Sequence, residues 1–119
     1  MKTGWIYYGD WYYLNEKGIM QTGWINLKGT WYYMDQSGAM ETGWLAYNKK
    51  WYYLKQTGEM QKGWLYSGGA WYYLSPNGDM KTGWIMDGGK WYYLYSSGVM
   101  AANTVIDGYR IGQDGAWVR

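Results

Sequence analysis

The 119-residue sequence predicts an all-β protein, a solenoid of stacked β-hairpins, on three observations. First, Trp-Tyr-Tyr triplets recur every 20 residues, beginning at Trp11, Trp31, Trp51, Trp71 and Trp91. Second, glycine occurs several times in every repeat and no 3.6-residue apolar period is sustained between the glycines, which disfavours helix. Third, the repeats are rich in Trp, Tyr and Ile, which favour strands. A constant period near 20 residues is typical of a solenoid rather than of a globule with one central core.

Each repeat divides into two expected strands joined by a tight turn. The first strand begins at a Gly-Trp pair, with its tryptophan at Trp5, Trp24, Trp44, Trp64 or Trp84, and the second is the Trp-Tyr-Tyr triplet with the apolar residue after it. Between them lie pairs that favour two-residue hairpin turns, namely Lys28-Gly29, Asn48-Lys49, Gly68-Gly69 and Gly88-Gly89. Each repeat is therefore expected to form one short β-hairpin.

A second, wider turn follows each triplet. It carries a glycine for which a positive φ is expected, followed two residues later by a methionine, at Met20, Met40, Met60, Met80 and Met100. We expect one array over residues 1–119, with about five hairpins in 3–102 and a closing segment in 103–119. The chain starts within the pattern and shows no signal-peptide core, so we expect a fragment of a longer protein.

The composition excludes several kinds of chemistry. There is no Cys and no His, so a disulfide, a thiolate nucleophile, a Ser-His-Asp triad and a His/Cys metal site are all ruled out. The 11 basic and 9 acidic residues give too little net charge for a nucleic-acid-binding surface. The longest apolar runs have four residues, far short of a membrane span. We predict no nucleic acid partner, no membrane span, no metal and no cofactor.

The acidic residues occupy no position that is acidic in every repeat. A ligand bound by all repeats must therefore be recognised by the recurring Trp, Tyr, Met and Gly, and we interpret the acids as solvated turn residues. No pair of carboxylates is suited to the acid and base of a glycosidase, so no catalytic residue is predicted.

Aromatic residues make up 23% of the chain, and none of them is Phe. Trp and Tyr are favoured where one end of the ring stays wet, whereas a dry core is more naturally built from Leu, Ile, Val and Phe. In the second repeat, Trp31 and Tyr33 lie on one strand face and Tyr32 and Met34 on the other, so stacked hairpins would cover both faces. Rings left facing a gap would form a box that binds quaternary ammonium groups by cation–π attraction, at about 0.5–2 kcal/mol per ring, or that stacks on sugars.

The run Gly23-Trp24, Trp31-Tyr32-Tyr33-Met34, Gly38-x-Met40 and Thr42-Gly43-Trp44 resembles the choline-binding repeat of streptococcal and phage cell-wall hydrolases and of choline-anchored surface proteins. Residues 107–118 resemble the closing segment of such surface proteins. The resemblance implies a left-handed superhelix of hairpins. It also implies a non-catalytic attachment module of a secreted protein, which binds choline or phosphocholine of teichoic and lipoteichoic acids at the bacterial cell surface.

In that family each site takes the Gly-Trp tryptophan and the first triplet tryptophan of one hairpin, a tyrosine of the next hairpin, and the intervening methionine. The resemblance implies four choline sites: Trp5, Trp11, Met20 and Tyr32; Trp24, Trp31, Met40 and Tyr52; Trp44, Trp51, Met60 and Tyr72; and Trp64, Trp71, Met80 and Tyr92. We select the middle tyrosine of the triplet because it points to the opposite face from its own tryptophan. The alternatives are the third tyrosines, Tyr33, Tyr53, Tyr73 and Tyr93.

The end of the array departs from the pattern. Trp84 and Trp91 are present, but the next Gly-Trp is missing and a single Tyr109 stands where a triplet would begin. Tyr109 either completes a fifth site or caps the stack, and we favour the cap because terminal repeats of solenoids are atypical.

Two functions other than choline binding are compatible with parts of this sequence. A carbohydrate-binding array, like the glucan-binding or clostridial toxin repeats, shares aromatic hairpins of similar length, but two Trp per unit with Gly-x-Met favour choline. An enzyme of the hydrolase group is disfavoured because the chain has no His and no recurring carboxylate.

Overall fold

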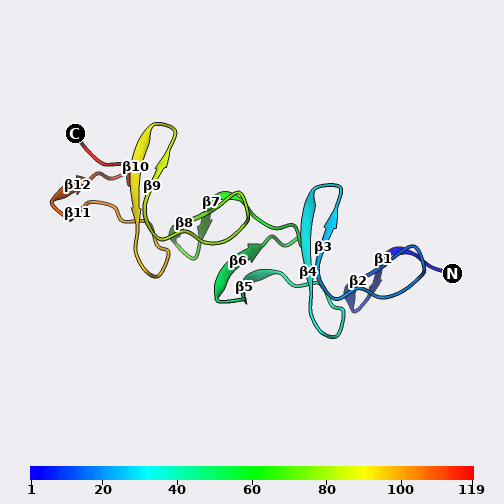
Figure 1. Ribbon diagram of the computed structural model, residues 1–119. Helices are drawn as coiled ribbons and strands as arrows, with labels where there is room; N and C mark the ends of the chain where they lie inside the picture. The colour runs from blue at the N-terminus through cyan, green and yellow to red at the C-terminus, as the bar shows by residue number, and fades with distance from the viewer. The chain divides into compact units, whose positions relative to one another are not determined.

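The computed structural model describes residues 1–119, which form 12 β-strands and no helix. The strands pair in chain order into six antiparallel two-stranded hairpins (Figure 1). The chain divides into two compact units, residues 1–61 and residues 62–119, with three hairpins each. The prediction of an all-β chain of successive hairpins is confirmed. The chain contains no helix long and apolar enough to cross a membrane.

The first unit contains three hairpins of equal strand length. They pair β1 (Gly4–Tyr8) with β2 (Asp10–Leu14), β3 (Gly23–Leu27) with β4 (Thr30–Met34), and β5 (Gly43–Tyr47) with β6 (Lys50–Leu54). The register places each Gly-Trp tryptophan opposite the third residue of its triplet, as in the pair Trp24 and Tyr33. Their rings meet edge to face at 5.1 Å, a cross-strand aromatic contact that stabilises the hairpin.

The second unit repeats this register in two hairpins and shortens it in the third. It pairs β7 (Gly63–Ser67) with β8 (Ala70–Leu74), β9 (Gly83–Asp87) with β10 (Lys90–Leu94), and β11 (Thr104–Ile106) with β12 (Tyr109–Ile111). The closing segment thus forms a sixth hairpin of its own, turning at Asp107 and Gly108.

The tight turns have positive φ at both central residues, which gives the twist that a two-residue hairpin needs. In the β3–β4 hairpin these values are 55° at Lys28 and 91° at Gly29, and the predicted pairs of the next three hairpins are also positive. The β1–β2 turn is shorter, since Tyr8 pairs directly with Asp10 around Gly9. The five glycines of the wider turns, at positions 18, 38, 58, 78 and 98, have φ between 77° and 92°, as expected.

The core is formed by the residue that follows each triplet. Met34, Leu54, Leu74 and Leu94 are completely inaccessible to solvent. Each of them also pairs, across the wider turn, with the methionine of its own repeat, as Met34 does with Met40. Burying one such side chain contributes about 1.5–3 kcal/mol, so this row of aliphatic side chains stabilises hairpins that would be marginal alone.

Backbone hydrogen bonds link successive hairpins within each unit. In the first unit, Met40 donates its N–H to the carbonyl of Trp11, and Met60 donates to Trp31, each at 2.9 Å. In the second unit, Met100 donates to Trp71 and Trp117 donates to Trp91, each at 2.8 Å. In these four cases the bonded residue, which follows a wider turn, is attached to the triplet tryptophan of the preceding hairpin, and this register places the side chains of the candidate site.

Candidate functional site

Three aromatic rings converge where the first hairpin meets the second. Trp5 lies 6.4 Å from Trp11 at an interplanar angle of 86°, and 5.0 Å from Tyr32 at 67°. With Met40, Gln56 and Thr57, these rings line a pocket of about 380 Å³. Trp11 is 43% exposed, so one wall is open to solvent. We call Trp5, Trp11, Tyr32 and Met40 box 1.

Box 1 differs from its sequence prediction in the methionine. Met20 was expected, but Met40 lines the pocket, because its backbone is bonded to Trp11. The side chains of Met20 and Met40 both lie against the wider-turn glycine of the next repeat, Gly38 and Gly58, but Met20 is not among the residues that line this pocket. The prediction grouped each methionine with the two tryptophans of its own repeat. In the structure, Met40 lies with the tryptophans of the preceding hairpin.

The same arrangement of rings occurs again in the first unit and once in the second. Box 2 consists of Trp24, Trp31, Tyr52 and Met60, and box 4 of Trp64, Trp71, Tyr92 and Met100. The two tryptophans are 6.3 Å apart in box 2 and 6.4 Å apart in box 4, and the tyrosine lies 5.1 Å and 5.0 Å from the Gly-Trp ring. The backbone of the methionine is bonded to the triplet tryptophan in both. Met40 was predicted for box 2 and Met80 for box 4. The methionines bonded to these boxes, Met60 and Met100, come from one repeat later.

The middle tyrosine of each triplet is the one that reaches the preceding hairpin. Tyr32 contacts Trp5, Tyr52 contacts Trp24, and Tyr92 contacts Trp64. The alternative third tyrosines contact the tryptophan of their own hairpin instead: Tyr13 meets Trp5, Tyr33 meets Trp24, Tyr53 meets Trp44, Tyr73 meets Trp64 and Tyr93 meets Trp84. Strand alternation, from which the middle tyrosine was selected, places the two tyrosines on opposite faces.

The third predicted set is divided between the two units. Trp44 and Trp51 lie 6.4 Å apart in the first unit, whereas Tyr72 belongs to the second. Met60, predicted for this set, is bonded to Trp31 of box 2. The third site stays a prediction.

A fifth group of rings lies at the end of the chain. Trp84, Trp91, Tyr109 and Trp117 line a pocket of about 400 Å³, and we call these residues box 5. Tyr109 lies 5.8 Å from Trp84 and 5.2 Å from Trp117. Tyr109 was expected to cap the stack, but in the structure it lines a pocket, as Tyr32 does in box 1.

Trp117 was not predicted as a site residue, although the sequence carries a signal for it. Gly115-Ala116-Trp117 repeats the Gly-x-Met pattern with Trp in place of Met, and its N–H bonds to Trp91 as the methionines bond to the other triplet tryptophans. The guanidinium carbon of Arg119 lies 4.9 Å from the centroid of the Trp117 ring. One ring of box 5 thus already takes part in a cation–π contact.

Two kinds of carboxylate adjoin the boxes, contrary to the expectation that the acids are only solvated turn residues. Burial, and secondly the negative charge of Glu59, raise the pKa of the Tyr32 hydroxyl in box 1. In the second unit, the indole N–H of Trp64 donates to Asp87 at 3.0 Å, and that of Trp84 donates to Asp107 at 3.4 Å.

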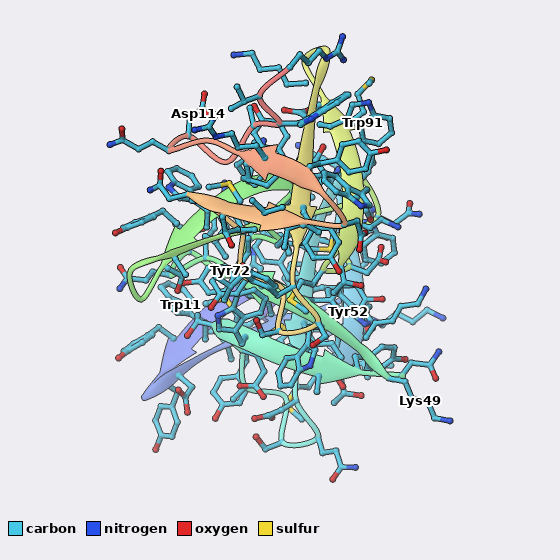
Figure 2. All side chains as sticks on the ribbon, turned by 90° about the vertical axis from the view of Figure 1, so that its left-hand side faces the viewer. Trp11, Lys49, Tyr52, Tyr72, Trp91 and Asp114 are labelled. Atoms are coloured by element: carbon cyan, nitrogen blue, oxygen red, sulfur yellow. The ribbon has the colours of Figure 1, made fainter.

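Aromatic walls without a buried counter-charge suit a soft, poorly hydrated cation. Figure 2 shows aromatic side chains projecting from the strands, among them Trp11, Tyr52 and Trp91. Residues 2–43, 21–62 and 41–82 match one family model of the choline-binding repeat, and residues 81–117 match a second. The chain belongs to the choline-binding repeat family. The chain is therefore a choline-binding-repeat, cell-wall-binding module.

Solved structures of choline-binding proteins share this fold. The chain is 53% identical to CbpJ from Streptococcus pneumoniae TIGR4, with a TM-score of 0.95, covering 99% of this chain and 41% of that one. It is 51% identical to choline binding protein F from Streptococcus pneumoniae, solved in the presence of a peptidoglycan analogue, with a TM-score of 0.95, covering 100% and 41%. A cell-wall endolysin from phage Cp-1, complexed with choline, is 34% identical, with a TM-score of 0.70, covering 99% and 38%.

The chain thus spans less than half the length of these relatives. No match among curated proteins was found.

Proposed function

We propose that boxes 1, 2, 4 and 5 each hold one trimethylammonium group of choline, and that the array 1–119 attaches its parent protein to phosphocholine on teichoic and lipoteichoic acids. In each box the cation would contact the faces of the two tryptophans and the tyrosine. The methionine, or Trp117 in box 5, would close the fourth side. The phosphate would extend into solvent past the exposed triplet tryptophan.

One observation carries this proposal: the same three rings, in the same mutual geometry, recur around boxes 1, 2 and 4. Packing alone would not require the triplet tryptophan of each of these boxes to stay 38–43% exposed beside two other rings. Three rings at about 1 kcal/mol each leave a single site weak once ordering and desolvation are subtracted. Attachment would therefore depend on several sites meeting a polymer with many cholines.

We also propose that the chain itself performs no reaction and acts outside the cell. No group of three or more acidic side chains gathers to hold a metal ion. The activity of the parent protein, whether hydrolase or adhesin, would reside in residues other than these. Assaying the chain alone for lysis of purified cell walls tests this, and lysis would contradict it.

The proposal is tested by retention on a choline-bearing resin. Millimolar free choline should elute the chain, and choline should quench or shift its tryptophan fluorescence. Dextran at equal sugar concentration serves as the competitor for the carbohydrate alternative and should leave the chain bound. Retention that dextran abolishes and choline does not would show that the boxes bind sugars instead.

A further inference from the structure

Boxes 4 and 5 share a feature that the recurring motif does not contain. In each, the Gly-Trp indole donates its N–H to an aspartate of the following hairpin, 23 residues later: Trp64 to Asp87 and Trp84 to Asp107. Asp87 ends β9 and pairs with Lys90, whereas Asp107, 20 residues later, is the first central residue of the β11–β12 turn, with a φ of 51°. The same position of the 20-residue sequence period thus brings a carboxylate to the edge of a box in two successive hairpins.

The same position is occupied by other chemistry in the first unit. At box 2 it is Tyr47, whose ring lies 5.9 Å from Trp24 and 6.4 Å from Tyr52. For box 1 the register position is Leu27, which pairs with Thr30 as Asp87 pairs with Lys90. This position is therefore acidic next to Trp64 and Trp84, aromatic next to Trp24, and apolar in the β3–β4 hairpin.

The carboxylate is placed to act on a bound cation without obstructing it. The indole N–H lies at the edge of the ring, so a hydrogen bond there leaves the ring face available to a ligand. The negative charge at the ring edge attracts an ammonium group that lies on the ring face. By accepting the N–H bond, the carboxylate also polarises the indole, so that the ring face becomes more negative. An uncharged ligand of the same shape gains nothing from either effect.

Other charged groups near these aspartates leave them available. Lys90 is the cross-strand partner of Asp87, but no ion pair within 4.0 Å joins them. Arg110 lies on β12, opposite Val105, and forms no ion pair with Asp107. Glu59 differs from both aspartates, because its charge acts on the hydroxyl of Tyr32 rather than through a tryptophan N–H.

We propose that Asp87 and Asp107 are specificity-determining residues, which make boxes 4 and 5 select for a positive charge, whereas box 2 recognises chiefly the shape and apolar surface of the ligand. This rests on the proposed function, since it assumes that the boxes bind choline. It divides one array of similar aromatic boxes into charge-selective and shape-selective sites.

The test compares choline with 3,3-dimethyl-1-butanol, in which a carbon replaces the ammonium nitrogen. Both are titrated into the 15N-labelled chain at low and at moderate salt, following the indole N–H signals of the individual tryptophans, assigned through single Trp→Phe variants. The variants are Asp87→Asn and Asp107→Asn, which retain an acceptor for the indole N–H but remove the charge. Asp10→Asn, at the exposed start of β2, is the matched control.

Asp87→Asn should weaken choline binding at box 4 about three- to tenfold at low salt, and leave the alcohol within about twofold. Raising the salt should reduce the difference between wild type and variant. Asp107→Asn should do the same at box 5, and Asp10→Asn should change neither box. The opposite change adds a charge. Leu27→Asp should increase the affinity of box 1 for choline relative to the alcohol, whereas Leu27→Asn should not.

Equal weakening of choline and the alcohol would overturn the proposal, because the aspartates would then only position the indoles. Unchanged choline affinity at boxes 4 and 5 would overturn it as well. Failure of the proposed function looks different, since the wild-type chain would then show no choline-dependent shift at any box.

Discussion

Met20 and Met40 occupy the same place in successive repeats but contact different parts of the first unit. Each packs against the wider-turn glycine of the next repeat, Gly38 or Gly58, but only Met40 also lines the pocket of box 1. We predict that Met40→Ala weakens choline binding at box 1 by about two- to fivefold, because it removes one apolar wall. Met20→Ala should leave that affinity unchanged. Site-resolved titration of the Trp5 and Trp11 indole signals measures both, and an effect of Met20→Ala alone would restore the original assignment.

Asp35 controls the wider turn of the second repeat through its charge. Its carboxylate accepts bonds from the hydroxyl and N–H of Ser37 and from the N–H of Ala39, and the Ser37 hydroxyl contributes most to lowering the pKa of Asp35. A lowered folded-state pKa means that the charge stabilises the fold above the unfolded pKa near 4, and that this stability is lost as the pH falls through the folded pKa.

We therefore predict that Asp35→Asn is less stable than wild type at pH 7 and that this difference shrinks toward pH 3. Asparagine can still cap the turn, because Asn15 accepts the N–H groups of Lys17 and Ile19 in the first repeat. Thermal unfolding at the two pH values measures the difference. Asp10→Asn, which removes a carboxylate with no such bonds, should show no comparable trend. A pH-independent difference for Asp35→Asn would contradict the assignment.

At the scale of the element, the β5–β6 turn is an exception among the tight turns. Its second central residue is Lys49, with a φ of 66°, where the β3–β4, β7–β8, β9–β10 and β11–β12 turns have glycine. Figure 2 shows Lys49 at the outer end of its hairpin. A side chain other than Gly, Asn or Asp in the left-handed region costs about 1 kcal/mol.

Lys49→Gly should therefore stabilise the chain by about 0.5–1 kcal/mol, raising Tm by about 2–4 °C. The inverse change at the matching position, Gly29→Lys, should destabilise it by a similar amount. Lys50→Gly places the same substitution one residue further on, in β6, and should lower Tm instead. Differential scanning calorimetry checks all three. A neutral or destabilising Lys49→Gly would show that the turn is stabilised by contacts of Lys49 itself.

The hairpins were predictable from the sequence, but the contacts between hairpins were predictable only in part. A strand, a turn pair and a positive-φ glycine are local features, so Gly29 and Trp31 specify their own hairpin. The period alone does not say which hairpin Met40 will contact, because every repeat offers the same partners. Strand alternation is local, so it could place the Tyr32 ring on the face that contacts Trp5, whereas Asp87 and Trp117 fall outside the recurring motif.

Under the proposed function, several weak boxes on one chain would act together through their number. Once one box has bound a polymer that carries many cholines, the next binding event is intramolecular, and avidity rises by about 10²–10⁴ without any new contact. Free choline is monovalent and gains nothing from this effect. The two kinds of ligand should therefore respond differently to the loss of a box.

The triplet tryptophans Trp11 and Trp71 are half-exposed, so they can be truncated with little loss of core. Trp11 and Trp71 are 43% and 42% exposed, and belong to boxes 1 and 4. The double variant Trp11→Ala/Trp71→Ala should bind free choline at its remaining boxes with unchanged affinity, yet dissociate from a densely choline-coated biosensor surface about 10- to 100-fold faster. On a sparse surface, where only one box engages at a time, the difference should fall to about twofold.

Tyr8→Ala is the matched control, because Tyr8 is an 86% exposed aromatic residue outside every box. It should dissociate like the wild type at both choline densities. If the double variant dissociated only about twofold faster on the dense surface as well, the boxes would be acting one at a time, and attachment to a cell wall would have to rest on a single dominant site.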